Sequence, residues 1–173
     1  GGVPRGKGLL RDGAKPGDDI WVSGRLGRAA LGLAYLQCKL KLNDQVRDDC
    51  LAALHQPQPR VALGLALRGI ANSAIDISDG LSADLGHILE CSQVGAELEV
   101  ELLPIVDEGV EKDIAQHSAL FGGDDYELCF TAPAAERDRL AALAGQLKLP
   151  LNCIGHIRAQ QGCTVHSADG SEM

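Results

Sequence analysis

Apolar and polar positions recur along the chain with periods that separate strands from helices. Short runs that alternate, or that are apolar throughout, predict strands. These runs cover residues 19–24, 74–79, 94–104, 121–133 (after an initial turn), 151–157 and 163–170. Longer segments with apolar residues three and four positions apart predict helices. These segments cover residues 26–42, 43–56, 61–72, 81–93 and 134–150, with weaker helical character over 104–120.

The alternation in residues 94–104 indicates the kind of sheet. Leu98, Val100 and Leu102 alternate with glutamates, so the pattern predicts a strand with one apolar face and one wet face. Such strands are typical of antiparallel or mixed sheets. Together with the helices, they predict an α/β (α+β) domain, in which a mixed, largely antiparallel sheet has helices packed on one face.

Composition limits the classes of partner. A net charge of −8 argues against a nucleic-acid surface, which needs clustered Lys and Arg. An acidic protein can still bind phosphate compounds through Mg²⁺. No apolar run is long enough for a membrane span, and no targeting signal opens the chain. The six cysteines are scattered without close pairs, so a reducing, cytoplasmic location is expected.

The start of the chain differs from the rest. Residues 1–17 are rich in glycine and turn formers and are expected to be a linker. The abrupt start suggests a longer protein, with residues 18–173 as its C-terminal domain.

The stretch "AIDISDGL" places acidic and hydroxyl side chains where a strand meets a helix. Asp76 and Ser78 share one strand face, and Asp79 with Gly80 forms the turn into the helix. One interpretation is a helix cap at Asp79 beside a solvated Asp76, with Asp84 on the helix surface. The other is a Mg²⁺ site, because carboxylates at a strand end suit this ion. Spacing alone favours the cap slightly, but a cap does not explain an aspartate inside a strand.

Two further stretches contain candidate residues. In "FGGDDYELCF" the glycines permit a tight turn or a close approach of the backbone to a ligand. Glu127, taken alone, is expected to point outward from its strand. Arg11 lies in a turn-rich stretch, where an arginine can clamp a phosphate but is usually solvated.

Three segments in this order resemble the thiamine-monophosphate kinase family. They are "RDGAKPGDDIWVSGRLG", "PQPRVALGLALRGIANSAIDISDGLSADLGHI" and "GGDDYELCFT". The resemblance implies the C-terminal domain of an aminoimidazole ribonucleotide synthetase-like protein that binds ATP between two domains. It implies ATP-dependent phosphorylation of thiamine monophosphate to thiamine diphosphate with Mg²⁺, by a homodimer of the full-length protein. Such a transfer depends mainly on positioning and charge neutralisation.

The resemblance also implies roles for individual residues. Asp76 and Asp79 look like Mg²⁺ ligands, Ser78 and Arg11 like ATP contacts, and Glu127 like a contact to thiamine monophosphate.

The chain departs from the family pattern in several places. Asp124 stands where the family usually has Glu, and Arg28 stands where Asp is common. The chain also ends at Met173, before the family's C-terminal aromatic segment, and lacks the N-terminal domain, so the fragment alone is expected to be inactive. The alternatives are another ATP-using member of the superfamily, similar to selenophosphate synthetase or a hydrogenase maturation protein, or a non-catalytic domain that binds a nucleotide or a partner.

Overall fold

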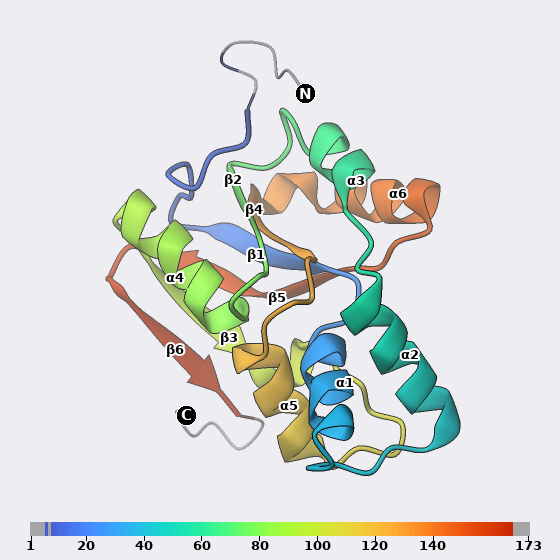
Figure 1. Ribbon diagram of the computed structural model, residues 1–173. Coiled ribbons are helices and arrows are strands. Elements are labelled where there is room, and N and C mark those ends of the chain that lie inside the picture. The colour runs from blue at the N-terminus through green and yellow to red at the C-terminus, as the bar shows by residue number, and fades with distance from the viewer. Residues whose placement is uncertain (1–5, 7, 168–173) are drawn as a thin grey trace.

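A six-stranded sheet forms the centre of the molecule in the computed structural model, which describes residues 6 and 8–167 (Figure 1). The strands are β1 (Asp18–Ser23), β2 (Ser73–Asp76), β3 (Gly95–Glu99), β4 (Leu128–Pro133), β5 (Leu151–Arg158) and β6 (Gly162–His166). Their order across the sheet is β2-β4-β1-β5-β3-β6. Every pairing is antiparallel except that of β3 with β6. The predicted mixed, largely antiparallel sheet is therefore confirmed.

The helices follow the predicted periodicity with shorter bounds. They are α1 (Arg28–Leu36), α2 (Asp44–His55), α3 (Val61–Ala66), α4 (Leu81–Ser92), α5 (Lys112–Phe121) and α6 (Arg137–Leu147), with short 3-10 turns η1 (Val100–Leu102) and η2 (Ala134–Glu136). The cap of α2 is the expected one, because the Asn43 side chain accepts a hydrogen bond from the Val46 N–H. The long strand predicted over 94–104 ends early, at Glu99, and Leu102 in the following turn is 51% exposed.

Helices cover both faces of the sheet, so the prediction of helices on one face was wrong in this detail. On one face Ile20 and Val22 of β1 join a core cluster with α4 and α5. On the other face Trp21 of β1 and Phe130 of β4 join a second cluster with α3 and α6, which lie side by side in Figure 1. The central strands β1 and β4 are apolar on both faces, which the one-sided pattern of residues 94–104 does not reveal.

The segment before β1 is fastened to the domain. Residues 8–17 contain no helix or strand, but Leu10 accepts a hydrogen bond from the Ala74 N–H at the edge of β2. The Ser92 hydroxyl at the end of α4 donates to the Arg11 carbonyl and accepts from the Ala14 N–H. These contacts place Arg11 beside β2. The remainder of the predicted linker, residues 1–5 and 7, lies outside the described residues, as do residues 168–173.

We expect Gly155→Ala to destabilise the sheet, because β3 passes very close to this glycine. A Cβ atom at position 155 would lie 2.0 Å from the Glu97 carbonyl oxygen. Relieving such a contact requires a backbone shift, so the free energy of unfolding should fall by about 2–3 kcal/mol. Gly145→Ala in α6 is the matched control: its Cβ meets nothing within 4 Å. It should raise stability by about 0.5–1 kcal/mol. Urea denaturation measures both changes, and equal effects would contradict the prediction.

None of the helices in the described part of the chain has the length and apolarity needed to cross a bilayer.

Candidate active-site groove

The two motifs that carry the candidate residues lie side by side. Beyond the end of β2, the Ile77 N–H donates to the Glu127 carbonyl and the Tyr126 N–H donates to the Ile77 carbonyl, at 2.8 and 2.9 Å. The Asp124 N–H donates to the Ser78 carbonyl at 2.9 Å. The acidic strand end and the segment 124–127 therefore form one structural unit.

Glycine permits this close pairing. A Cβ atom at Gly123 would lie 2.5 Å from the Ser78 carbonyl oxygen, so no larger residue fits here without a backbone shift. The close backbone approach expected from the glycine pair is thus made to the protein's own chain. Asp124 and Tyr126 both have positive φ, of 67° and 51°, which is uncommon for residues other than glycine. Such strained residues concentrate at functional sites.

Asp84 organises the turn between β2 and α4, and its predicted place on the helix surface was wrong. Its side chain is buried, and its Oδ2 accepts hydrogen bonds from the backbone N–H groups of Ser78 and Asp79, at 2.8 and 3.0 Å. The cap position of α4 is Gly80, which makes no side-chain cap bond, so the interpretation of Asp79 as the cap was also wrong. The Asp84 carboxylate therefore stabilises the turn, and the carboxylate of Asp79 is exposed.

Asp76 and Asp79 present free carboxylates at this turn. Both are exposed, and neither carboxylate forms a hydrogen bond or ion pair within residues 6 and 8–167. The pKa of Tyr126 is raised, first by the carboxylate of Asp124, to which its hydroxyl donates at 3.3 Å, and further by Asp76 and Asp79. The three carboxylates therefore surround one tyrosine, and the negative potential there favours a cation.

These side chains fit part of a Mg²⁺ site. Mg²⁺ typically takes one or two protein carboxylates and completes its shell with water and phosphate oxygens. Asp76 and Asp79 can provide such oxygens. Over the described ranges, no group of three or more His, Cys, Asp or Glu side chains is arranged to hold a metal ion. The chain thus offers oxygen ligands for a metal that phosphate oxygens would also hold, without a complete protein cage.

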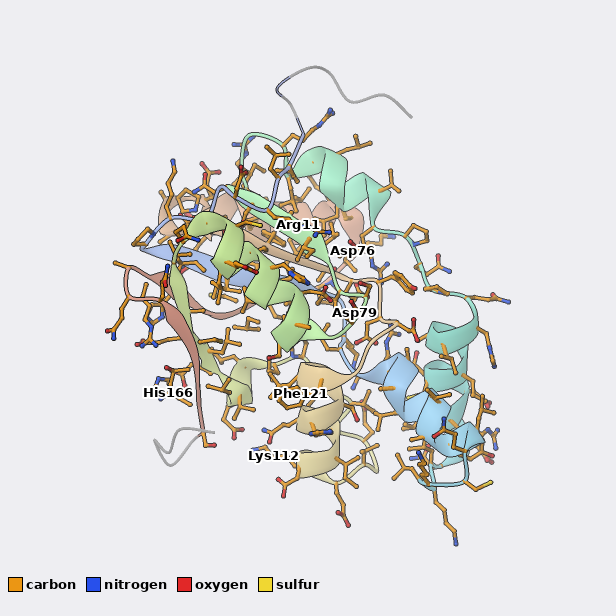
Figure 2. All side chains as sticks on the ribbon, turned by 60° about the vertical axis from the view of Figure 1, so that its left-hand side comes forward. Arg11, Asp76, Asp79, Lys112, Phe121 and His166 are labelled. Carbon is orange, nitrogen blue, oxygen red and sulfur yellow. The ribbon has the colours of Figure 1, made fainter. Side chains whose placement is uncertain are left out.

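A long apolar groove runs past Asp76. One part, of about 740 Å³, is lined by Arg11, Asp76 and Leu128, and an adjoining part of about 430 Å³ shares Asp76 and Leu128 and reaches Tyr126. Arg11 and Asp76 therefore border the same cavity, as the predicted phosphate clamp requires, and Figure 2 shows both beside Asp79 on one side of the molecule.

Glu127 is buried, and the expectation that it points outward was wrong. It is 1% exposed, and its Oε2 accepts from the Ser23 hydroxyl at 2.6 Å. The guanidinium of Arg60 donates to both carboxylate oxygens, at 2.7 and 2.5 Å, and Arg28 lies 3.6 Å away. Glu127 borders a separate cavity of about 150 Å³, away from Asp76. Of the five predicted site residues, Arg11 and Asp76 therefore border the groove, and Ser78 and Asp79 lie in the turn that follows Asp76. Glu127 does not border the groove and is paired with Arg60.

Asp125 takes the place of a capping side chain for α1. Its carboxylate accepts hydrogen bonds from the backbone N–H groups of Gly27 and Ala29, at 2.6 and 3.3 Å. A negative charge is favourable at a helix N-terminus. Burial nevertheless raises the pKa of Asp125 to about 6, although the two backbone bonds and Arg28 oppose the change.

We expect this raised pKa of Asp125 to make stability depend on pH. In the folded state the carboxyl keeps its proton up to about pH 6, whereas in the unfolded chain it loses it near pH 4. The contribution of Asp125 is therefore fully present below about pH 4 and is lost as pH rises through 6, by up to about 3 kcal/mol. Urea denaturation of the wild type and of Asp125→Asn across this range measures the difference. The wild type should lose stability relative to Asp125→Asn as pH rises from 4 to 7. A wild type that gains stability relative to Asp125→Asn over this range would contradict the prediction.

The sequence analysis did not identify the roles of three residues of this region: Arg60, Asp84 and Asp125. Arg60 meets Glu127 across 67 residues of chain, and no local pattern marks such a pair. Asp84 carried one signal, since its position in the first turn of α4 allows a side chain to reach back to the preceding loop.

Comparisons with known proteins identify the family of the chain. The family described as "AIR synthase related protein, C-terminal domain" matches residues 15–167. The thiamine-monophosphate kinase of Escherichia coli (strain K12) is 49% identical over 163 residues, which cover 92% of this chain and 50% of that protein. The chain thus spans about half the length of the curated relatives it matches.

Solved structures similar to this chain also include thiamine-monophosphate kinases. The thiamine-monophosphate kinase of Stenotrophomonas maltophilia K279a is 48% identical with a TM-score of 0.88, and the match covers 99% of this chain and 56% of that one. A structure described as AaThiL complexed with AMPPCP and TMP is 30% identical with a TM-score of 0.77, and the match covers 95% of this chain and 52% of that one.

Proposed function

The chain belongs to the AIR synthase related protein family, as its C-terminal domain, and from this premise we propose that it is part of a thiamine-monophosphate kinase. The whole protein transfers the terminal phosphate of ATP to thiamine monophosphate and forms thiamine diphosphate. It works with Mg²⁺ and as a homodimer. The sequence identity of 45–49% to several curated kinases of this name supports the proposal.

One observation carries the proposal for this half of the site. The strand end with Asp76 is hydrogen-bonded to the segment that contains Asp124 and Tyr126, so that free carboxylates border a groove that also contains Arg11. In this arrangement Asp76 and Asp79 would contribute oxygens to a Mg²⁺ ion, and that ion would neutralise phosphate charge. This chemistry needs no protein nucleophile.

The other residues bind and orient. Arg11 and Ser78 contact ATP: the guanidinium can donate two hydrogen bonds to phosphate oxygens, and the hydroxyl of Ser78 lies next to the Asp79 turn. Glu127 contacts thiamine monophosphate.

The test is direct measurement of the reaction. The whole protein that contains this chain is incubated with ATP, Mg²⁺ and thiamine monophosphate, and thiamine diphosphate is quantified by chromatography. We expect product only when all three are present. ATP binding without turnover of thiamine monophosphate would overturn the proposal and favour a domain that only binds nucleotide.

A further inference from the structure

The side chain of Arg60 stands between the groove and the cavity of Glu127. Arg60 and Pro57 are the residues that border both the 430 Å³ part of the groove, beside Asp76, and the 150 Å³ cavity, beside Glu127. The smaller space cannot hold a drug-sized ligand by itself, since such sites usually measure about 300 Å³ or more. Displacement of the Arg60 side chain would therefore open the smaller space toward the groove.

The same guanidinium is hydrogen-bonded to both carboxylate oxygens of Glu127. Its Nε and Nη2 each donate to one oxygen, and the whole side chain of Glu127 is 1% exposed. A carboxylate accepts such a fork with both oxygens at once. A ligand therefore cannot form the same two-pronged pairing with Glu127 while Arg60 is in this position.

Arg60 and Arg28 differ in how many carboxylates hold them. Arg28 is also hydrogen-bonded to Asp49 at 3.2 Å, whereas Glu127 is the single acidic partner of Arg60 within the described residues. After Arg60 has left, Glu127 keeps the hydrogen bond from Ser23 and the nearby charge of Arg28. The buried carboxylate is thus not left without a partner, which would be costly.

We propose that a ligand must displace the Arg60 side chain to reach Glu127, and that Arg60 thereby determines which ligands bind there. The inference rests on the proposed function, in which Glu127 contacts the substrate. A ligand that replaces Arg60 must itself offer positive charge or paired N–H donors, because otherwise the carboxylate loses hydrogen bonds. Thiamine monophosphate has such chemistry, with an amino group on its pyrimidine and a cationic thiazolium ring. Arg60 thereby acts as a specificity-determining residue.

The test compares two arginine variants of the whole protein. Arg60→Met keeps the length of the side chain but removes its fork and charge. A ligand then no longer has to displace it, so the KM for thiamine monophosphate should fall at least about threefold while the KM for ATP stays unchanged. Arg139→Met, at an exposed arginine of α6, is the matched control and should change neither value. A raised KM for thiamine monophosphate in Arg60→Met would overturn the inference, because a residue that only holds Glu127 in place gives that result.

Further measurements keep the inference separate from the proposed function. Arg60→Lys retains the charge without the fork, so it should fold well and lower the same KM by a smaller factor. If the wild type forms no thiamine diphosphate, the proposed function fails. The displacement of Arg60 is then tested with guanidinium ion alone. Low millimolar guanidinium should raise the Tm of Arg60→Ala more than methylammonium does. It should not raise the Tm of the double variant that combines Arg60→Ala with Glu127→Gln. Equal effects of the two ions would overturn the inference.

Discussion

Replacement of Asp76 by Asn is expected to lower kcat for thiamine diphosphate formation about 100-fold at limiting Mg²⁺, with little change in stability. The carboxylate of Asp76 is exposed at the end of β2, and it borders both parts of the groove. Its loss removes an oxygen ligand and part of the negative potential that attracts the metal. Because no described residue pairs with this carboxylate, the Tm should stay within about 2 °C of the wild type.

The same measurement on Asp113→Asn supplies the control. Asp113 is an exposed aspartate in the first turn of α5 and undergoes the same chemical change away from the groove. Its kcat should match that of the wild type at every Mg²⁺ concentration. Saturating Mg²⁺ should restore part of the activity of Asp76→Asn, since a weakened metal site binds again at higher concentration. Near-normal turnover of Asp76→Asn at limiting Mg²⁺ would contradict the assignment, and Asp79→Asn is judged by the same criterion.

Sequence periodicity predicted the type of those helices and strands that have one solvent-exposed face. The helix α4 and the strand β3 have distinct apolar and polar positions. The helix ends one residue before its expected bound, whereas the strand begins within one residue of its expected start and ends five residues early, at Glu99. The cover of both sheet faces was missed because β1 has large apolar residues on both faces, with Ile20 and Val22 on one and Trp21 on the other. Such short runs look alike whether one or two helical layers cover them. The register among strands depends on contacts across more than 100 residues, such as Trp21 with Phe130, which no local pattern contains.

The candidate site was predictable from local motifs only in part. The strand-end pattern indicated that Asp76 and Ser78 converge beside a helix, and the structure places them there. The same pattern predicted Asp79 as the helix cap and Asp84 as a surface residue. Instead the cap position is Gly80, Asp84 is buried and binds the turn, and Asp79 is exposed. Both residues are aspartates within the same junction, and the choice between them depends on how the backbone turns at Gly80, with φ of 114°. Glu127 needs Arg60 and Ser23 as partners, and those come from distant parts of the chain.

Replacement of Asp84 by Ala is expected to damage both stability and activity. The Asp84 side chain is buried and accepts the N–H groups of Ser78 and Asp79, which would lose their partner in the variant. An unsatisfied buried donor costs about 1–3 kcal/mol, so the free energy of unfolding should fall by about 2–4 kcal/mol. For a chain of 173 residues this lowers the Tm by about 5–12 °C. The turn that aims Ser78 and Asp79 would also loosen, so kcat should fall even at temperatures where the variant stays folded.

Two companion variants separate the causes. In Asp84→Asn the amide oxygen can still accept both N–H groups, so most of the stability should return if the hydrogen bonds matter and the charge does not. Glu90→Ala, at an exposed acidic position of the same helix, should be close to neutral in both measurements. Equal losses in Asp84→Asn and Asp84→Ala would instead assign the effect to the negative charge near the N-terminus of α4. An Asp84→Ala variant with normal Tm and kcat would mean that the turn keeps its shape without this side chain, and that the exposed carboxylates of Asp76 and Asp79 are positioned by the sheet alone.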